Sequence, residues 1–323
     1  MNLRNITEPI ESELDAFDDY FRTAMRSDVA FVDMIARYIV RQKGKRIRPM
    51  LVLLTAKACG GVNERSFRGA ALVEILHTAT LIHDDVVDEA DTRRGFASIN
   101  AVWKNKIAVL MGDYMLAKGL LLSLNNDDFG FLKIISDAVR RMSEAEILQI
   151  AKSRKLDIDE KTYLRIISDK TASLIATCCE IGASSASGDP EIHRRMKIFG
   201  ENVGMVFQIR DDLLDYTGRT SITGKPTGLD LQEKKLTLPL IYALTRAPKS
   251  ENRSILRAIK NGAKKKDIAD VVEFVGTYGG IDYTERKGAY YSSLAVDALA
   301  PLPSSPAKDA LTRAVGFFLE RSK

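Results

Sequence analysis

Two clusters of aspartates, far apart in the chain, share one spacing. Both follow the pattern DDxxD, with Asp84, Asp85 and Asp88 in the first cluster and Asp211, Asp212 and Asp215 in the second. On a helix, the first and last carboxylates of each cluster lie one turn apart and share a face. Like charges at that spacing destabilise a helix by roughly 0.2–0.5 kcal/mol. Each cluster therefore predicts a positively charged partner.

Magnesium is the partner that fits carboxylates of this spacing, because it prefers oxygen ligands and keeps several waters. Apolar residues precede both clusters, Leu81-Ile82 in one case and Met205–Phe207 in the other, which predicts carboxylates at the rim of a buried surface. Mg²⁺ held by one or two carboxylates commonly takes phosphate oxygens as further ligands. Two facing clusters would thus hold a polyphosphate, although either cluster alone is also typical of a solvated helix face.

Cationic and polar side chains elsewhere in the chain are suited to hold the anion. Arg93-Arg94 follow the first cluster by about one and a half helical turns, and His77 precedes it by ~10 Å along nearly the same face. A lone cation is more often a solvated surface residue, and a lone histidine on an apolar helix is more often part of the core. Taken together they predict two anion sites: Lys45, Arg48, His77, Arg93, Arg94, Lys170, Thr171, Gln208, Lys225 and Lys235.

The elements that must position these residues are predicted to be helices. No proline occurs between Pro49 and Pro190, and apolar residues recur there at helical spacing, for example behind a candidate N-cap at Asp159. Asn261-Gly262 is typical of a helix C-cap rather than of a hairpin. We therefore expect a single all-α domain over residues 1–323, a bundle of ten or more helices around a central cavity.

One segment departs from the helical pattern. Thr217–Pro239 is rich in Gly, Thr and Lys and has no apolar period. Long polar loops inside compact helical proteins are usually functional. We expect this one to lie over the anion site.

The composition excludes several classes of protein. The 323 residues are 45% hydrophobic with a net charge of +5, which indicates a globular chain and gives no argument for nucleic acid. Three cysteines without metal-ligand spacing favour a reducing compartment. No apolar run approaches the ~20 residues of a membrane helix, and the N-terminus lacks a signal-peptide pattern. We expect a cytoplasmic protein without stable membrane insertion.

Motifs along nearly the whole chain resemble those of the trans-isoprenyl diphosphate synthases, or polyprenyl synthetases. They are GKRIRP at Gly44–Pro49, LHTATLIHDDVVDEADTRRG at Leu76–Gly95, GDYMLAKG at Gly112–Gly119, DKTASL at Asp169–Leu174, FQIRDDLLDY at Phe207–Tyr216 and GKPTGLDLQEKKLTLPLI at Gly224–Ile241. Several motifs in this order make the resemblance specific.

The resemblance implies a role for each matching residue. It implies two or three Mg²⁺ ions on the six aspartates and catalytic roles for Asp84, Asp85, Asp88, Lys170, Thr171 and Gln208. An allylic diphosphate would be bound by Arg93, Lys170, Thr171, Gln208, Lys225 and Lys235, and isopentenyl diphosphate by Lys45, Arg48, His77 and Arg94. Lys234 stands where the family usually has glycine, so the role given to Lys235 remains open to Lys234.

The implied reaction is the Mg²⁺-dependent head-to-tail (1′-4) condensation of isopentenyl diphosphate with an allylic diphosphate. Short-chain members of the family often carry an aromatic four or five residues before the first cluster, where this chain has Ala79 and Thr80. Small side chains there favour a long all-trans product, C35–C50 and octaprenyl-like, of the kind used for quinone side chains. A short-chain farnesyl or geranylgeranyl diphosphate synthase is the alternative. The family is usually homodimeric.

Three other interpretations are weaker. Class I terpene cyclases carry a different second motif, and non-catalytic regulatory subunits tend to lose the aspartates. A nucleic-acid binder is suggested only by Lys264–Lys266, a short basic run followed by Asp267 and typical of a solvated helix face. We therefore expect small-molecule substrates and no nucleic acid.

Overall fold

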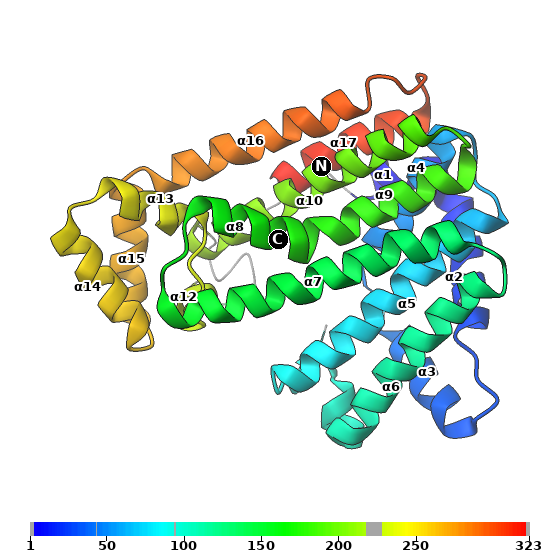
Figure 1. The fold of residues 1–323 in the computed structure, drawn as a ribbon, viewed down its shortest axis with the longest axis horizontal. Helices are drawn as coiled ribbons and strands as arrows, with labels where there is room; N and C mark the ends of the chain where they lie inside the picture. The colour runs from blue at the N-terminus through cyan, green and yellow to red at the C-terminus, as the bar shows by residue number, and fades with distance from the viewer. Residues whose placement is uncertain (1–2, 43, 94, 218–227, 321–323) are drawn as a thin grey trace.

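The structure, a computed structural model, describes residues 3–42, 44–93, 95–217 and 228–320. This part of the chain is almost entirely helical (Figure 1), so the predicted all-α fold is confirmed. The helices are α1 (Arg4–Thr7), η1 (Glu8–Ile10), α2 (Glu11–Ala24), α3 (Ala30–Arg41), α4 (Ile47–Cys59), α5 (Glu64–Val87), α6 (Ile99–Leu124), α7 (Phe129–Lys155), α8 (Glu160–Ile167), η2 (Ser168–Ala172), α9 (Ser173–Ala186), α10 (Pro190–Thr217), α12 (Leu229–Gln232), α13 (Leu238–Arg246), α14 (Lys249–Lys260), α15 (Lys265–Thr277), α16 (Gly280–Ala298) and α17 (Pro306–Glu320).

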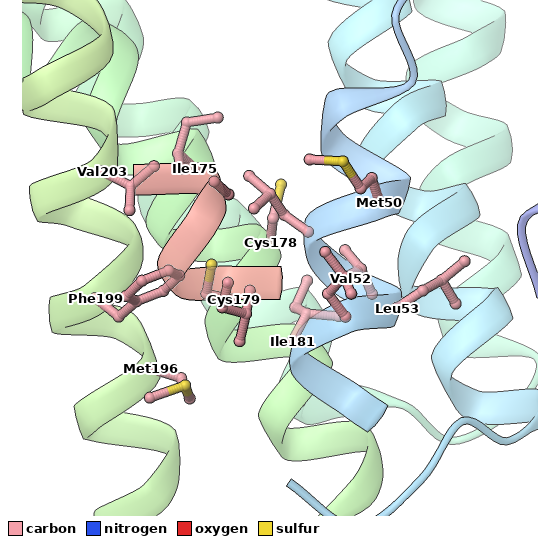
Figure 2. Packing of buried hydrophobic residues seen from close by; sticks show 14 of the residues in the cluster. Met50, Val52, Leu53, Ile175, Cys178, Cys179, Ile181, Met196, Phe199 and Val203 are labelled. Carbon is pink, nitrogen blue, oxygen red and sulfur yellow. The ribbon is translucent and has the colours of Figure 1, made fainter. Parts of the chain in front are cut away.

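Helix α9 is central to the packing. It contacts α4, α5, α7 and α10, and its buried residues span its whole circumference, as expected for a helix without a solvated face. Figure 2 shows Cys178 and Ile181 of α9 between Met50 of α4 and Phe199 of α10. The two cysteines of α9 are fully buried core residues, and neither forms a disulfide.

Two glycines bring α10 close to its neighbours. A Cβ atom at Gly204 would lie 2.4 Å from the Cα of Ala172, and one at Gly200 would lie 2.7 Å from the Cα of Ala176. Neither distance is possible for real side chains, so both positions require glycine. This contact holds η2 directly against the helix that carries the second aspartate cluster.

Two apolar clusters support the two aspartate motifs. Ile75, Ile82 and Met111 belong to a cluster between α3, α5 and α6, below the first motif. Ile209 and Tyr216, on either side of the second motif, belong to a cluster that α8, α13 and α15 complete. Each motif therefore lies at the edge of a separate packed region, as the apolar residues before it predicted.

The segment behind Asp159 is helical as predicted but not uniform. Asp159 is the N-cap of α8, and its side chain accepts a hydrogen bond from the backbone N–H of Thr162 at 2.8 Å. The helix then changes to the π-helical turn η2 before it continues as α9. A π turn contains an extra residue that apolar periodicity does not reveal.

Arg93, after the first aspartate cluster, is not on a helix, which corrects the spacing argument made above. Helix α5 ends at Val87, and Glu89 takes a left-handed backbone with φ 51°. Arg93 lies in the two-residue strand β1 (Thr92–Arg93), which pairs antiparallel with β2 (Phe96–Ala97). Strands this short leave no alternation for a sequence to show.

Helix α6 is more apolar than was expected from the sequence, where no long apolar segment was predicted. It has 26 residues and is, by length and composition alone, apolar enough to cross a membrane, with 33% of its most apolar window buried. Core helices of soluble proteins meet the same criterion. One face of α6, with Ala108 and Met115, packs in the apolar cluster it shares with α5, while Leu110 and Leu121 are exposed.

Candidate active site

The first aspartate cluster lies at the C-terminal end of α5. Asp85 is buried, with 4% of its surface exposed, and its Oδ1 accepts a hydrogen bond from Nε of Arg93 at 2.8 Å and a second from Nη2 of the same side chain. Asp84 and Asp88 are exposed. The hairpin that interrupts the helical pattern thus places an arginine against the inner carboxylate and leaves the outer two facing solvent.

Asp84 faces charged groups from other helices. Although part of its surface is exposed, its pKa is raised, first because the neighbouring helices shield the carboxylate from part of the solvent and then because Glu146 and Asp88 are negative, while Lys170 and Arg93 act in the opposite direction. These neighbours lie on α7, η2 and β1. The first cluster is therefore within electrostatic range of Lys170, as a shared diphosphate site requires.

The second cluster is held by neutral donors. Asp212 is buried, and its two oxygens accept hydrogen bonds from the Tyr163 hydroxyl at 2.7 Å and the Gln208 amide at 2.6 Å. Asp215 accepts bonds from the backbone N–H groups of Gly228, Leu229 and Asp230, at 2.9, 3.1 and 3.2 Å. Asp211 is exposed.

Burial changes the protonation of this second cluster. It raises the pKa of Asp212 well above the ordinary range of aspartate, and the charges of Asp230 and Asp211 add to the effect. The pKa of Asp230 is raised by its own burial and by Asp215. A cation arriving here would compete with protons for these carboxylates.

The π turn connects the two clusters. The Thr171 hydroxyl donates to Oε1 of Gln208 at 2.8 Å, so η2, Gln208 and Asp212 form one hydrogen-bonded chain. Lys170 extends the other way, where its Nζ pairs with Glu146 and donates to Oε1 of Gln149 at 3.3 Å. Lys170 therefore already contacts a carboxylate, which a bound diphosphate would replace as its partner.

One cavity brings together residues that the sequence had suggested separately. Its lining includes five side chains predicted for the allylic diphosphate site or the second metal site: Lys170, Thr171, Gln208, Asp212 and Lys235. Lys234, the alternative to Lys235, lines the same cavity. A second cavity, lined by Arg46, Glu74, Asp85 and Arg93 among others, lies beside the first cluster.

The residues predicted for isopentenyl diphosphate lie around the start of α4 and on α5. Lys45 is exposed just before α4, Arg48 is in the first turn of α4, and His77 is buried on α5. Arg94 of this set, and Lys225 of the allylic set, lie outside the described residues.

The residues predicted for the product tunnel lie beside α6. Ala79 is 2% exposed and packs in the cluster that contains Met111 and Met115. The Thr80 hydroxyl donates to the carbonyl oxygen of His77 at 2.8 Å. Neither residue lines the two cavities described above.

Four residues of the site carried no clear signal in the sequence: Glu146, Gln149, Tyr163 and Asp230. Glu146 and Gln149 are spaced so that they share a face of α7, a pattern too common to single out. Asp230 lies in the polar segment that was predicted to be functional. Tyr163 is an apolar-face residue whose hydroxyl meets Asp212 only through tertiary packing.

The donor set suits a cation that brings other ligands with it. In the described part of the chain, no group of three His, Cys, Asp or Glu side chains is close enough to hold a metal alone. Asp84, Asp88 and Asp211 are exposed, whereas both oxygens of Asp212 already accept hydrogen bonds. Mg²⁺, which commonly keeps waters and binds substrate phosphates, fits such an incomplete set.

Comparison with known proteins decides the family. The polyprenyl synthetase family model matches residues 29–275. The chain belongs to the polyprenyl synthetase family. It is 37% identical over 319 residues to the all-trans-nonaprenyl-diphosphate synthase (geranyl-diphosphate specific) of Rhodobacter capsulatus, with 98% of each chain covered. It is 34% identical to the octaprenyl diphosphate synthase of Escherichia coli strain K12, over 100% of each.

The fold agrees with this assignment. A crystal structure of polyprenyl synthase from Caulobacter crescentus CB15, complexed with calcium and isoprenyl diphosphate, superposes with a TM-score of 0.90. The two chains are 34% identical, and the match covers 100% of this chain and 98% of the other. This polyprenyl synthetase is thus a prenyltransferase with the isoprenoid synthase fold.

Proposed function

We propose that this polyprenyl synthetase condenses isopentenyl diphosphate with an allylic diphosphate, head to tail, and releases diphosphate. The observation that carries the proposal is the cavity in which Lys170, Thr171, Gln208 and Lys235 meet Asp212. These are the side chains that an allylic diphosphate would need. Lys45, Arg48, His77 and Arg94 would bind isopentenyl diphosphate.

Magnesium would be held chiefly by Asp84, Asp88 and Asp211. The inner carboxylates have other partners, Arg93 for Asp85 and Tyr163 with Gln208 for Asp212, so they support the ligands beside them. Two or three bound ions would supply positive charge against the diphosphate as it leaves. The polyprenyl synthase from Caulobacter crescentus, which is complexed with calcium and isoprenyl diphosphate, supports a divalent cation in such a site.

The chain's own residues would act on the diphosphate and on the cation. The bond from the allylic C1 to oxygen breaks, and its electron pair leaves with the diphosphate, which Lys170, Lys235 and Arg93 stabilise. The alkene of isopentenyl diphosphate then forms the new carbon–carbon bond to C1. A proton leaves the isopentenyl unit, and the released diphosphate accepts it, since no described side chain is placed as an obvious base.

Thr171 and the polar segment would protect the carbocation. The Thr171 hydroxyl donates to Gln208, so the lone pairs of its oxygen would be available to stabilise the carbocation. Within the polar segment over residues 217–239, residues 218–227 lie outside the described residues. The described part lines the cavity with Lys234 and Lys235 and would help to exclude water, because water would consume the cation.

The product is proposed to be long. The relatives named above are, according to their names, octaprenyl and nonaprenyl diphosphate synthases. Ala79 and Thr80 have no aromatic side chain that could block a long product. Because Ala79 packs near Met111 and Met115, a growing tail would have to displace these methionines, whose flexible side chains permit such movement. A short-chain product is the alternative.

Product chromatography tests this function. The protein is incubated with farnesyl diphosphate and isopentenyl diphosphate, with Mg²⁺ or with EDTA. We expect C35–C50 all-trans diphosphates only with Mg²⁺, and shorter products from Ala79→Tyr with its melting temperature recorded alongside. Turnover in EDTA would sink the metal assignment. Unchanged products from a folded Ala79→Tyr enzyme would move the tunnel elsewhere.

We also infer a cytoplasmic homodimer in which the whole chain is one domain. Helix α6 presents Val102, Leu110, Leu121 and Leu124 to solvent, each more than two-fifths exposed, which is typical of an interaction surface. Light scattering would report the mass of the assembly. A monomer at micromolar concentration, or a Leu110→Asp variant that stays dimeric, would argue against α6 as the interface.

A further inference from the structure

The turn that carries Lys170 and Thr171 has an uncommon geometry. Residues Ser168–Ala172 form a π-helical turn between α8 and α9. Such turns are rare because their backbone geometry is less favourable than that of an α-helix, and they are frequent at functional sites. Something must therefore hold this turn in place when the site is empty.

Arg141 of α7 makes the contacts that do so. Its Nε donates to Oδ1 of Asp169 at 2.7 Å, and its Nη2 donates to Oγ of Ser168 at 3.1 Å and to Oε1 of Glu201 at 2.9 Å. The Ser168 hydroxyl donates to the same Glu201 oxygen at 2.9 Å. One guanidinium group thus joins α7, the π turn and α10.

The position of Arg141 separates it from the chemistry. Its side chain is only 17% exposed, and it is not part of the lining of the cavity that contains Lys170 and Thr171. Its partners Ser168 and Asp169 directly precede Lys170 in the chain. Any effect of Arg141 on the reaction must therefore pass through the residues that it contacts, and those in the π turn directly adjoin Lys170.

We propose that Arg141 is a positioning residue that fixes the π turn so that Lys170 and Thr171 point into the allylic diphosphate site. The proposal rests on the function proposed above for those two side chains. A guanidinium group offers several donors in a rigid planar arrangement, which a lysine cannot replace. Without it, Ser168 and Glu201 lose the group that joins them to α7, Asp169 keeps the longer contact with Arg165 at 3.5 Å, and the turn shifts.

The test compares two adjacent arginines. Arg141→Met and Arg141→Lys are measured beside Arg140→Met, which removes an arginine that is 58% exposed and pairs with Asp137 and Glu144 on the solvent side of α7. We expect both Arg141 variants to lose ~10–100-fold in kcat with farnesyl diphosphate, because a displacement of about 1 Å has such an effect. The KM for isopentenyl diphosphate and the activity of Arg140→Met should stay near wild type.

A second background distinguishes positioning from general stability. In Lys170→Ala/Thr171→Ala enzyme, Arg141→Met should cause little further loss of kcat, because both side chains that it positions are gone. Equal fold-losses in both backgrounds, or a kcat for Arg141→Met within ~2-fold of wild type, would overturn the proposal. If Arg141→Met does not fold, Arg141→Lys and Glu201→Gln carry the same comparison. A Lys170→Ala enzyme with wild-type kcat would instead refute the proposed function.

Discussion

The two DDxxD clusters have the same spacing but different surroundings. In the first, the inner carboxylate, Asp85, is neutralised by an arginine on a hairpin. In the second, the inner carboxylate, Asp212, meets the neutral donors Tyr163 and Gln208 and lies near further acidic groups. The inner carboxylate of the first cluster is therefore paired with a positive charge, whereas that of the second cluster is not.

The difference shows that a motif fixes the spacing of its ligands but not their protonation. Asp212, held by neutral donors and buried near other acidic groups, has a strongly raised pKa, so its protonated form is favoured more than that of an ordinary aspartate. Asp215 is tied to the start of α12 through three backbone N–H groups. The second cluster is therefore the one in which metal binding should be linked to proton release and to the placement of α12.

The largest effect is expected at an outer carboxylate of the first cluster. Asp84→Asn keeps the shape of the side chain but removes the charge that faces Lys170 and Glu146. Loss of one charge-stabilising group in an active site typically lowers kcat by ~10²–10³-fold. Steady-state kinetics with farnesyl and isopentenyl diphosphates measure the change.

Asp91→Asn is the matched control for that experiment. Asp91 is an exposed carboxylate shortly after the cluster, on the way to the hairpin. Its removal should leave kcat near wild type. Equal losses in the two variants, or a near-normal rate for Asp84→Asn, would remove Asp84 from the mechanism.

The second prediction concerns pH and metal removal. Burial raises the pKa of Asp212 to about 8 in the folded chain, above its unfolded value near 3.9. Stabilisation by its proton is complete below pH ~4 and is lost as the pH rises through about 8. In EDTA, the melting temperature should therefore fall by roughly 5 °C between pH 6 and pH 9, and Mg²⁺ should restore more of it at the higher pH.

Asp212→Asn sharpens that measurement. The amide cannot titrate, so the melting temperature of this variant in EDTA should depend much less on pH over the same range. Asp85→Asn changes the corresponding position of the first cluster and should keep the pH dependence of the wild type. If Asp212→Asn retains the full slope, another group is responsible, with Asp230 the first to examine, because its pKa is also raised.

Much of this site follows from the sequence because helices repeat regularly. Spacing alone placed Asp84 and Asp88 on one face and identified Asp159 as an N-cap. The same regularity explains the errors. The π turn at Ser168–Ala172 adds a residue that periodicity does not detect, and the hairpin at Arg93 is too short to alternate.

Contacts between helices were beyond the reach of the sequence. The Tyr163–Asp212 bond joins α8 to α10, and the Lys170–Glu146 pair joins the π turn to α7. Both depend on how closely the helices approach, which Gly204 decides by allowing η2 against α10. The sequence alone identifies a glycine at position 204 but does not show that it packs against Ala172.

The third prediction tests the charge balance of the first cluster. Arg93→Gln leaves Asp85 buried without its cation, and an uncompensated buried charge is strongly destabilising. Because Arg93 is about one-third exposed, solvent screens part of this effect, and we expect a loss of about 1–3 kcal/mol in the free energy of unfolding. Urea denaturation measures it. Restored stability in Arg93→Gln/Asp85→Asn would confirm the unpaired carboxylate as the cause, and no loss in the single variant would contradict the pairing.

The smallest effect is expected from the corresponding change in the second cluster. Tyr163→Phe removes the neutral hydroxyl that donates to Asp212 and leaves the ring packed in its apolar cluster. A neutral donor contributes about 0.5–1.5 kcal/mol, less than the cation of the first cluster. Since this bond lowers the pKa of Asp212, its loss should also shift the steep part of the pH–stability curve in EDTA to higher pH. If Tyr163→Phe destabilises the protein more than Arg93→Gln does, charge balance is not what distinguishes the two clusters, and burial alone sets the stability of both.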